Sequence, residues 1–231
     1  MSHSPGIDRS FWQSAMMIVF VCAVFSLAVG QSTNQSSATR IAKVKQAVVI
    51  ISTVDRAGKP LLQGSGFFVS ADLVVTNLHV VKDAALIKIE MFDGSATSIQ
   101  SVVAVNEKED LALLKTKMPQ VNVAVLQLAD SAPAEGASIF VMSNPRGYQW
   151  KLTQGEVGPI WKFQGVGNRF QVSALILPGS SGAPVVNSEG RVVGIAAMHL
   201  DSSDNLNFAV SSESLRSLQA STNLASLGPA R

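Results

Sequence analysis

Short apolar runs rich in valine and isoleucine recur along most of the chain. Runs of this length, separated by turn residues, predict β-strands rather than helices. Six strands are expected at 47–54, 66–70, 73–76, 86–92, 98–105 and 111–115, and six more at 138–142, 150–157, 166 or 169–175, 183–186, 191–198 and 206–210. Turn signals such as Asp93-Gly94 and Glu189-Gly190 mark hairpins between neighbouring strands.

Helical spacing replaces the strand pattern only near the end of the chain. Ser211 or Ser212 can cap a helix, and Leu215 and Leu218 continue it through about Ala220. Two series of strands with one late helix indicate an all-β protein, built either as two barrels or as one long sandwich. Periodicity alone leaves both arrangements open.

The N-terminal region carries a different signal. Ala15 to Val29 is an uncharged apolar run preceded by Arg9, and it is shorter than the stretch of about 20 residues that spans a membrane. We therefore predict a signal peptide over 1–30, with an uncleaved membrane anchor as the alternative. The only cysteine, Cys22, lies in this run, so the remaining chain would have no disulfide. An exported domain without disulfides suits the bacterial periplasm or cell envelope.

The rest of the chain divides by composition and punctuation. Residues 31–39 are rich in Ser, Thr, Asn and Gln, which predicts a flexible leader, with structure beginning near Ile41 or Lys45. The expected parts are a leader at 31–44, an N-terminal β-barrel half at 45–118, a connector at 119–136, a C-terminal half with the terminal helix at 137–220, and a tail at 221–231.

Charge and residue spacing exclude several functions. Lys and Arg total 18 and Asp and Glu total 16, a balance that offers no footprint for nucleic acid. The three histidines are isolated, and neither metal-ligand spacing nor a cofactor fingerprint is present. The sequence therefore predicts neither a metal nor a cofactor, and no nucleic acid partner.

Candidate chemistry is centred on residues 178–184, where glycines flank Ser180 and Ser181 between two prolines. A serine hydroxyl needs a base and an orienting carboxylate to become a nucleophile. His79 follows a predicted strand and precedes a short helical turn, although a packed core histidine is the alternative there. Asp110 heads the strand at 111–115, where a simple turn residue is the alternative and Glu109 is a rival.

Together, these segments resemble one family. Gly64 to Val69 with Val75 to Val81, Asp110 to Lys115, and Pro178 to Pro184 resemble the histidine, aspartate and serine segments of trypsin-like serine proteases of the HtrA (Deg) type. The resemblance runs from about Ile41 to Leu218. It implies an all-β, trypsin-like double six-stranded β-barrel with a short C-terminal helix. Only about ten residues follow Ala220, so we expect a protease domain alone, without a PDZ domain.

The resemblance also implies catalytic roles. Ser181 would be the nucleophile, His79 the general base and then acid, and Asp110 the group that fixes the imidazole tautomer. The backbone N–H groups of Gly179 and Ser181 would form the oxyanion hole. Where the family usually has Gly-Asn-Ser-Gly-Gly, this chain has Ser at 180 and Ala at 183. The added methyl group of Ala183 could limit the conformations of the loop.

A substrate pocket follows from the same resemblance, with Leu175, Ile176, Leu177, Ala197, Met198 and His199 as its predicted lining. No carboxylate lies among these residues, so we expect small or medium aliphatic P1 side chains. His199 leaves open an acidic P1 residue, and an exposed histidine at the end of a strand is the alternative for that position.

The predicted function is an exported serine endopeptidase that cleaves exposed segments of unfolded or damaged proteins through an acyl-enzyme at Ser181. Its partners would be unfolded polypeptides, and the resemblance makes a trimer one oligomeric state to consider. The alternative is a catalytically silent, protease-like module that binds peptides or acts as a scaffold. Ala183 and the expected lack of a PDZ domain motivate that alternative.

Overall fold

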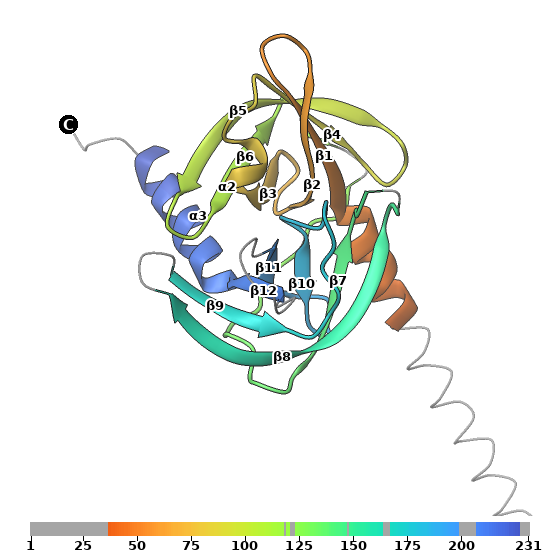
Figure 1. Ribbon diagram of the computed structural model, residues 1–231, viewed down its shortest axis with the longest axis vertical. Helices are drawn as coiled ribbons and strands as arrows, with labels where there is room; N and C mark the ends of the chain where they lie inside the picture. Colours follow the sequence, from red (N-terminus) through yellow and green to blue (C-terminus); the bar gives the residue numbers. More distant parts are fainter. Residues whose placement is uncertain are drawn as a thin grey trace, which may run out of the picture. The chain divides into compact units, whose positions relative to one another are not determined.

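The computed structural model describes residues 37–117, 119–120, 123–146, 148–163, 167–198 and 207–226 of the chain. Its twelve strands form two closed antiparallel barrels of six strands each, drawn one above the other in Figure 1. This arrangement confirms the predicted double six-stranded barrel and excludes the single long sandwich. Closure leaves neither barrel with an unpaired strand edge.

The first barrel places the ends of two strands side by side. Its strands are β1 (Val48–Val54), β2 (Pro60–Phe68), β3 (Leu73–Asn77), β4 (Leu86–Glu90), β5 (Ala96–Asn106) and β6 (Leu111–Thr116). The order is β1-β2-β3-β6-β5-β4, and β4 pairs back with β1 to close the barrel. Within the β3–β6 pair, Asn77 lies opposite Leu111. The end of β3, just before His79, therefore meets the start of β6, just after Asp110.

The second barrel anchors the loop that carries Ser181. Its strands are β7 (Ser138–Ser143), β8 (Lys151–Phe163), β9 (Gly167–Val172), β10 (Pro184–Val186), β11 (Val192–Met198) and β12 (Asn207–Ser211). The short strand β10 pairs with both β7 and β11, with Val185 opposite Val141 on one side and Gly194 on the other. The chain is thus held within three residues of Ser181.

One hydrophobic cluster joins the two barrels. Phe67 and Val75 from the first barrel, Met142 and Ile195 from the second, and Leu215 from the C-terminal helix are all buried in it. Each such side chain contributes about 1.5–3 kcal/mol when fully buried. The shared core sets the barrels against each other, so that loops from both can contribute to one site.

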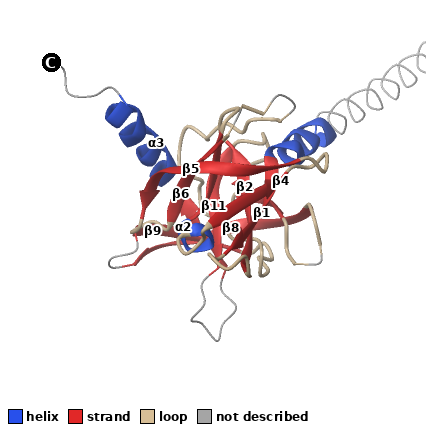
Figure 2. Ribbon diagram, turned by 90° about the horizontal axis from the view of Figure 1, so that it is seen from above, coloured by secondary structure: helices blue, strands red, loops and turns tan. Residues whose placement is uncertain are grey.

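The C-terminal helix α3 (Ser212–Ser226) packs against β5 of the first barrel and β11 and β12 of the second (Figure 2). Its Leu215 and Leu218 are buried, as helical spacing predicts. The helix extends beyond the expected end near Ala220, because no glycine or proline interrupts the chain before Gly228.

A second helix spans residues 37–47, within the region where the composition indicated a flexible leader up to residue 44. Val44 and Ala47 are buried in the hydrophobic cluster that joins the barrels and lie one helical turn apart. This apolar stripe is too short for periodicity to reveal in the sequence. The predicted signal peptide or anchor at 1–30 lies outside the described residues. In the part of the chain that the structure describes, no helix has the length and apolar character needed to cross a membrane.

Candidate active site

His79 lies in the short helix α2 (Leu78–Val81), which begins directly after β3. The first N–H groups of a helix lack partners within the helix. Here Asp110 supplies them: its carbonyl oxygen accepts the Leu78 N–H at 3.0 Å, and its Oδ1 accepts the His79 N–H at 2.8 Å. The fully buried Asn77 adds a bond from Nδ2 to the same carbonyl at 2.9 Å. Asp110 therefore holds the start of the helix that carries His79.

The second carboxylate oxygen of Asp110 lies 2.6 Å from His79 Nδ1. An ionised carboxylate only accepts hydrogen bonds, so Nδ1 carries the proton in this pair. The other ring nitrogen, Nε2, then keeps a lone pair that can accept a proton. The His79 and Asp110 side chains are 36% and 25% exposed, so a substrate can reach the imidazole.

Asp110 has a left-handed backbone, with φ of 55°. Only a few per cent of non-glycine residues take this conformation, and aspartate is among those that tolerate it best. The chain turns sharply here, with the Asp110 N–H donating to the Glu107 carbonyl at 3.3 Å, before it enters β6. This turn directs both the carbonyl and the carboxylate toward α2.

Ser181 lies between the two barrels and is 5% exposed. Its carbonyl oxygen accepts the N–H of Ser65 from β2 at 2.8 Å, and the next residue, Gly182, donates to the Ala196 carbonyl of β11 at 2.9 Å. A Cβ on Gly64 would lie 2.7 Å from Val80 Cγ1 and 3.2 Å from the Ser181 carbonyl oxygen. The Ser181 loop and helix α2 therefore both pack closely against Gly64.

Residues 177–180 form a β-turn ahead of Ser181. The Ser180 N–H donates to the Leu177 carbonyl at 2.9 Å, and Gly179 has φ of 99°. Proline at the second position and a left-handed glycine at the third define a type II turn. Among the described residues, the N–H groups of Gly179 and Ser181 have no hydrogen-bond partner. Both groups are therefore available to an oxygen atom of a ligand.

The side chains of the two residues that depart from the family pattern, Ser180 and Ala183, are both buried. Ser180 is fully buried; its Oγ donates to Ser143 Oγ at 3.0 Å and accepts the Leu177 N–H at 3.3 Å. Ala183 is also fully buried and packs with Ile139 and other apolar residues of the second barrel. The extra methyl group thus fills core space.

The predicted pocket residues occupy different environments. Leu175 is 51% exposed, whereas its neighbour Ile176 is buried in the core of the second barrel. Ala197 is buried in the separate cluster that joins the barrels, and Met198 ends β11 opposite Asn207. His199 lies outside the described residues. The pocket therefore stays a prediction.

A cavity of about 540 Å³ opens beside His79 and Asp110. Apolar side chains form much of its wall, with Lys82 and Glu107 as charged members; the other lining residues are Leu78, Val81, Ala84, Ile87, Val102 and Val105. Val102 and Val105 are 44% and 45% exposed, so the cavity continues onto an apolar stretch of β5.

Two further charged residues lie near Asp110: Arg169, which was not anticipated from the sequence, and Glu109, which the sequence offered as a rival to Asp110. Burial lowers the pKa of Arg169, which is 7% exposed, while the nearby carboxylates of Asp110 and Glu109 act in the opposite direction. Burial raises the pKa of Glu109, and Arg169 partly offsets that shift. Ser65 and Asn144, which are joined by a hydrogen bond between the two barrels, were missed as site residues. Ser65 lies in the Gly64 to Val69 segment that carries the family resemblance, whereas neither Arg169 nor Asn144 lies in a local pattern that marks a site.

Within the described residues, no group of His, Cys, Asp and Glu side chains is arranged to hold a metal ion. The site offers a carboxylate-oriented imidazole, a buried serine and two backbone donors without a partner among the described residues. This set suits nucleophilic attack on a carbonyl group, in which an oxyanion develops.

Comparisons with known proteins agree with this description. A family model described as trypsin-like peptidase domain matches residues 64–195. Serine protease HTRA1 of Xenopus laevis is 35% identical over 170 residues, covering 70% of this chain and 36% of that protein. A probable periplasmic serine endoprotease DegP-like of Chlamydia pneumoniae is 33% identical over 143 residues, covering 59% and 29%. The chain thus spans only about a third of the length of each relative.

A solved structure of an HtrA-type protease with a tripeptide has a TM-score of 0.71 and 25% identity, covering 80% of this chain and 62% of that one. The similarity extends over both barrels, because coverage of that size exceeds what either barrel alone would supply.

Proposed function

The chain belongs to the trypsin-like peptidase family, with HtrA serine proteases among its relatives, and from that premise we propose that it is a serine endopeptidase. In this proposal Ser181 is the nucleophile, His79 the general base and then acid, and Asp110 the orienting carboxylate. The observation that carries the proposal is the pair of hydrogen bonds from His79 N–H and Nδ1 to the two carboxylate oxygens of Asp110.

In the proposed mechanism, Ser181 Oγ attacks the carbonyl carbon of the scissile peptide and His79 Nε2 takes the hydroxyl proton. The negative oxygen of the tetrahedral intermediate accepts the N–H groups of Gly179 and Ser181, each worth about 2.7–4 kcal/mol when well aimed. His79 then gives its proton to the leaving amine, and the acyl group stays on Ser181. A water molecule, deprotonated by His79, releases the second product and restores the serine.

We propose exposed segments of unfolded polypeptides as substrates. The cavity beside His79 is open and lined largely by apolar side chains. Such a lining suits the apolar side chains that a substrate protein exposes when it unfolds. We further propose that the protein acts outside the cytoplasm. The apolar run at 15–29 and the word periplasmic in the name of the Chlamydia relative support this location. N-terminal sequencing of the mature protein tests it: a start at Gln31 is expected after export, and a start at Met1 would count against a cleaved signal.

Labelling with a fluorophosphonate tests the nucleophile. Wild type should react, with mass spectrometry placing the label on Ser181 rather than on the adjacent Ser180, and Ser181→Ala should stay unlabelled. Ser131→Ala, which changes an exposed serine of the connector, is the matched control and should label like wild type.

Cleavage of unfolded casein tests turnover in the same samples. Equal labelling of wild type and Ser181→Ala would refute the assignment. If wild type binds peptides without cleaving casein and Ser181→Ala binds them equally well, the silent binding module is the better description.

A further inference from the structure

The carbonyl oxygen of Gly179 is held by a side chain from the other barrel. Ser65 lies in β2, and its Oγ donates to this carbonyl at 2.8 Å. The same Oγ accepts the N–H of Asn144 at 2.9 Å. Ser65 is fully buried, so water does not compete for either bond. One hydroxyl thus connects the turn before Ser181 with the segment that follows β7.

The direction of the Gly179 N–H depends on the type of this turn. A type II turn has φ near +80° at its third residue, whereas a type I turn has φ near −90°. The two forms differ by a rotation of the peptide plane between the second and third residues, here Pro178 and Gly179. That rotation would carry the Gly179 N–H to the opposite side of the turn. With φ of 99°, Gly179 is in the type II form.

Hydrogen bonds hold both peptide planes that border Gly179. The Pro178 carbonyl accepts the N–H of Arg146 at 3.1 Å, which fixes the plane that contains the Gly179 N–H. Because carbonyl and N–H point in opposite directions across a trans peptide, this N–H points away from Arg146. The next plane is fixed by Ser65 at its carbonyl and by Leu177 at its N–H.

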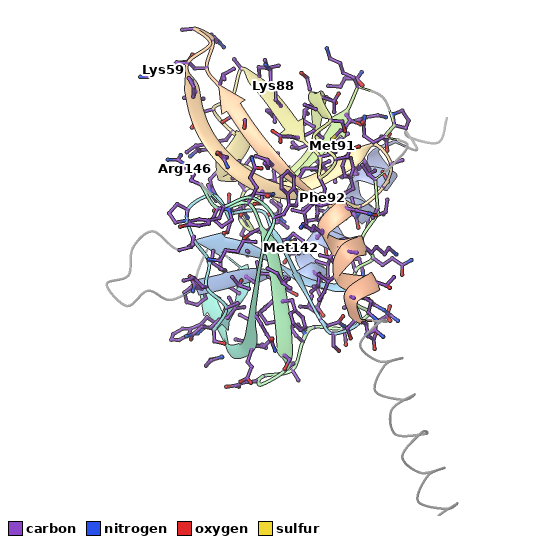
Figure 3. The ribbon with its side chains drawn as sticks, turned by 90° about the vertical axis from the view of Figure 1, so that its right-hand side faces the viewer. Lys59, Lys88, Met91, Phe92, Met142 and Arg146 are labelled. Carbon is purple, nitrogen blue, oxygen red and sulfur yellow. The ribbon has the colours of Figure 1, made fainter. Side chains whose placement is uncertain are left out.

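The segment that provides the Arg146 N–H is itself tied to the first barrel. Asn144 is fully buried; its Nδ2 donates to the Val49 carbonyl of β1 at 3.1 Å and its Oδ1 accepts the Trp150 N–H at 2.8 Å. Figure 3 shows Arg146 at the level where the two barrels meet, below the hairpin that carries Lys59. The first barrel therefore supports both peptide planes, one through Ser65 and the other through Asn144.

We propose that Ser65 is a positioning residue for the oxyanion hole. Its hydroxyl holds the Gly179 carbonyl and, through the Asn144 N–H, the segment whose Arg146 N–H keeps the Pro178–Gly179 peptide in the type II form, and so aims the Gly179 N–H at the substrate oxygen. This inference rests on the proposed function, since the aim of this N–H matters only if an oxyanion forms. Ser65 touches neither substrate nor reacting atoms, and its effect is transmitted through Gly179.

The test compares two deletions of buried hydroxyls that have the same bonding pattern. Ser65→Ala removes one bond donated to a carbonyl and one accepted from an N–H. Thr53→Val does the same in β1, where Thr53 Oγ1 donates to the Leu62 carbonyl at 3.1 Å and accepts the Leu62 N–H at 3.0 Å, and Thr53 is 2% exposed. Both variants should lose similar stability in urea unfolding.

Only Ser65→Ala should change the chemistry. Losing one oxyanion donor completely costs about 10²–10³ in kcat, so a turn that samples the type I form should lose about tenfold or more. KM should stay within about twofold, because the carbonyl of the bound substrate carries little charge. Affinity for a peptide boronic acid, which forms a tetrahedral adduct, should fall in proportion to kcat/KM. Thr53→Val should retain the kcat of wild type.

An NMR measurement separates this inference from the proposed function. The Gly179 carbonyl carbon and amide signals should shift in Ser65→Ala and stay in place in Thr53→Val, whether or not the protein cleaves peptides. Unchanged Gly179 signals in Ser65→Ala would overturn the inference, as would a kcat equal to that of Thr53→Val. A wild-type protein that neither labels nor cleaves would refute the proposed function, and the Gly179 signals would still decide the role of Ser65 in the turn.

Discussion

Replacing Gly182 with alanine should damage the nucleophile loop, and it should cost more than the same replacement at the other left-handed glycines of the loop and the hairpins. Gly182 follows Ser181 and has φ of 87°. A Cβ at this position would overlap the carbonyl oxygen of Ser65 and the Oγ1 of Thr76, and would lie 3.1 Å from the Asn77 N. Neither oxygen can move away freely, because they are joined by a hydrogen bond of 2.8 Å within the first barrel.

Gly94 supplies the matched control. It has φ of 84° in the hairpin between β4 and β5, and a Cβ there would have no atom within 4 Å. Left-handed backbone costs alanine about 1–2 kcal/mol at either position. Overpacking adds about 1–3 kcal/mol only at Gly182. We therefore expect losses of about 1–2 kcal/mol for Gly94→Ala and about 2–5 kcal/mol for Gly182→Ala, out of a total stability of about 5–15 kcal/mol.

Urea unfolding followed by tryptophan fluorescence measures both losses, and the rate of fluorophosphonate labelling reports on Ser181. Gly94→Ala should label at the wild-type rate. Gly182→Ala should label at least tenfold more slowly while still folded, because relief of the overlap must displace the Ser181 backbone. Equal stability losses in the two variants, or wild-type labelling by Gly182→Ala, would contradict the packing argument.

Two further predictions concern the charges around His79. Asp110→Asn should lower kcat by about 10⁴, the value for the same change in a trypsin-like template. The reason is that an amide cannot accept hydrogen bonds from both the backbone N–H and the Nδ1–H of His79. A loss of less than tenfold in the steady-state kinetics of the folded variant would count against this geometry. Burial raises the pKa of Glu109, so the folded state binds the carboxyl proton of Glu109 more tightly than the unfolded state does. Ionised Glu109 therefore destabilises the folded state, and this loss of stability is fully present above the raised pKa. Glu109→Gln should therefore be more stable than wild type near neutral pH, and the difference in unfolding free energy should vanish as the pH falls toward the ordinary glutamate pKa near 4.5. A difference in unfolding free energy that stays constant over this pH range would refute the prediction.

Local sequence patterns were sufficient for the strands. The short apolar runs and the turn residues between them depend only on neighbouring positions, and both barrels contain the strands that these signals indicated. Two strands are longer than predicted: β2 begins at Pro60 and β8 ends at Phe163. Side-chain direction was harder to predict outside the strands. Leu175 and Ile176 follow the end of β9 in an irregular segment, where no strand period applies; the structure exposes the first and buries the second, and the pocket that the resemblance implied stays a prediction.

Contacts between distant segments were beyond the sequence alone. Ser65 and Gly179 are 114 residues apart, and Asn144 lies 95 residues from its partner Val49. A buried serine within a strand has no spacing or composition that distinguishes it from a packing residue. Such a bond becomes visible only once closure of both barrels and their shared core have set the positions of the two segments.

Asp110 shows why the site needs a strained residue where glycine would fit the backbone more easily. A left-handed conformation costs a non-glycine residue about 1–2 kcal/mol, and glycine would avoid that cost. Glycine, however, has no carboxylate to accept the two hydrogen bonds from His79. Bonds to a charged acceptor contribute about 1.5–3 kcal/mol each, so this pair alone exceeds the strain.

The same left-handed turn also directs the Asp110 carbonyl to Leu78 and Asn77, which joins the start of α2 to the start of β6. In an extended conformation the carbonyl and the carboxylate would not both face α2, and either the helix start or the imidazole would lose its partner. The pairing of β3 with β6 brings the two chain ends together, and the backbone turn at Asp110 then aims both groups at them. Strain at this residue is therefore required by the geometry of the His79–Asp110 pair.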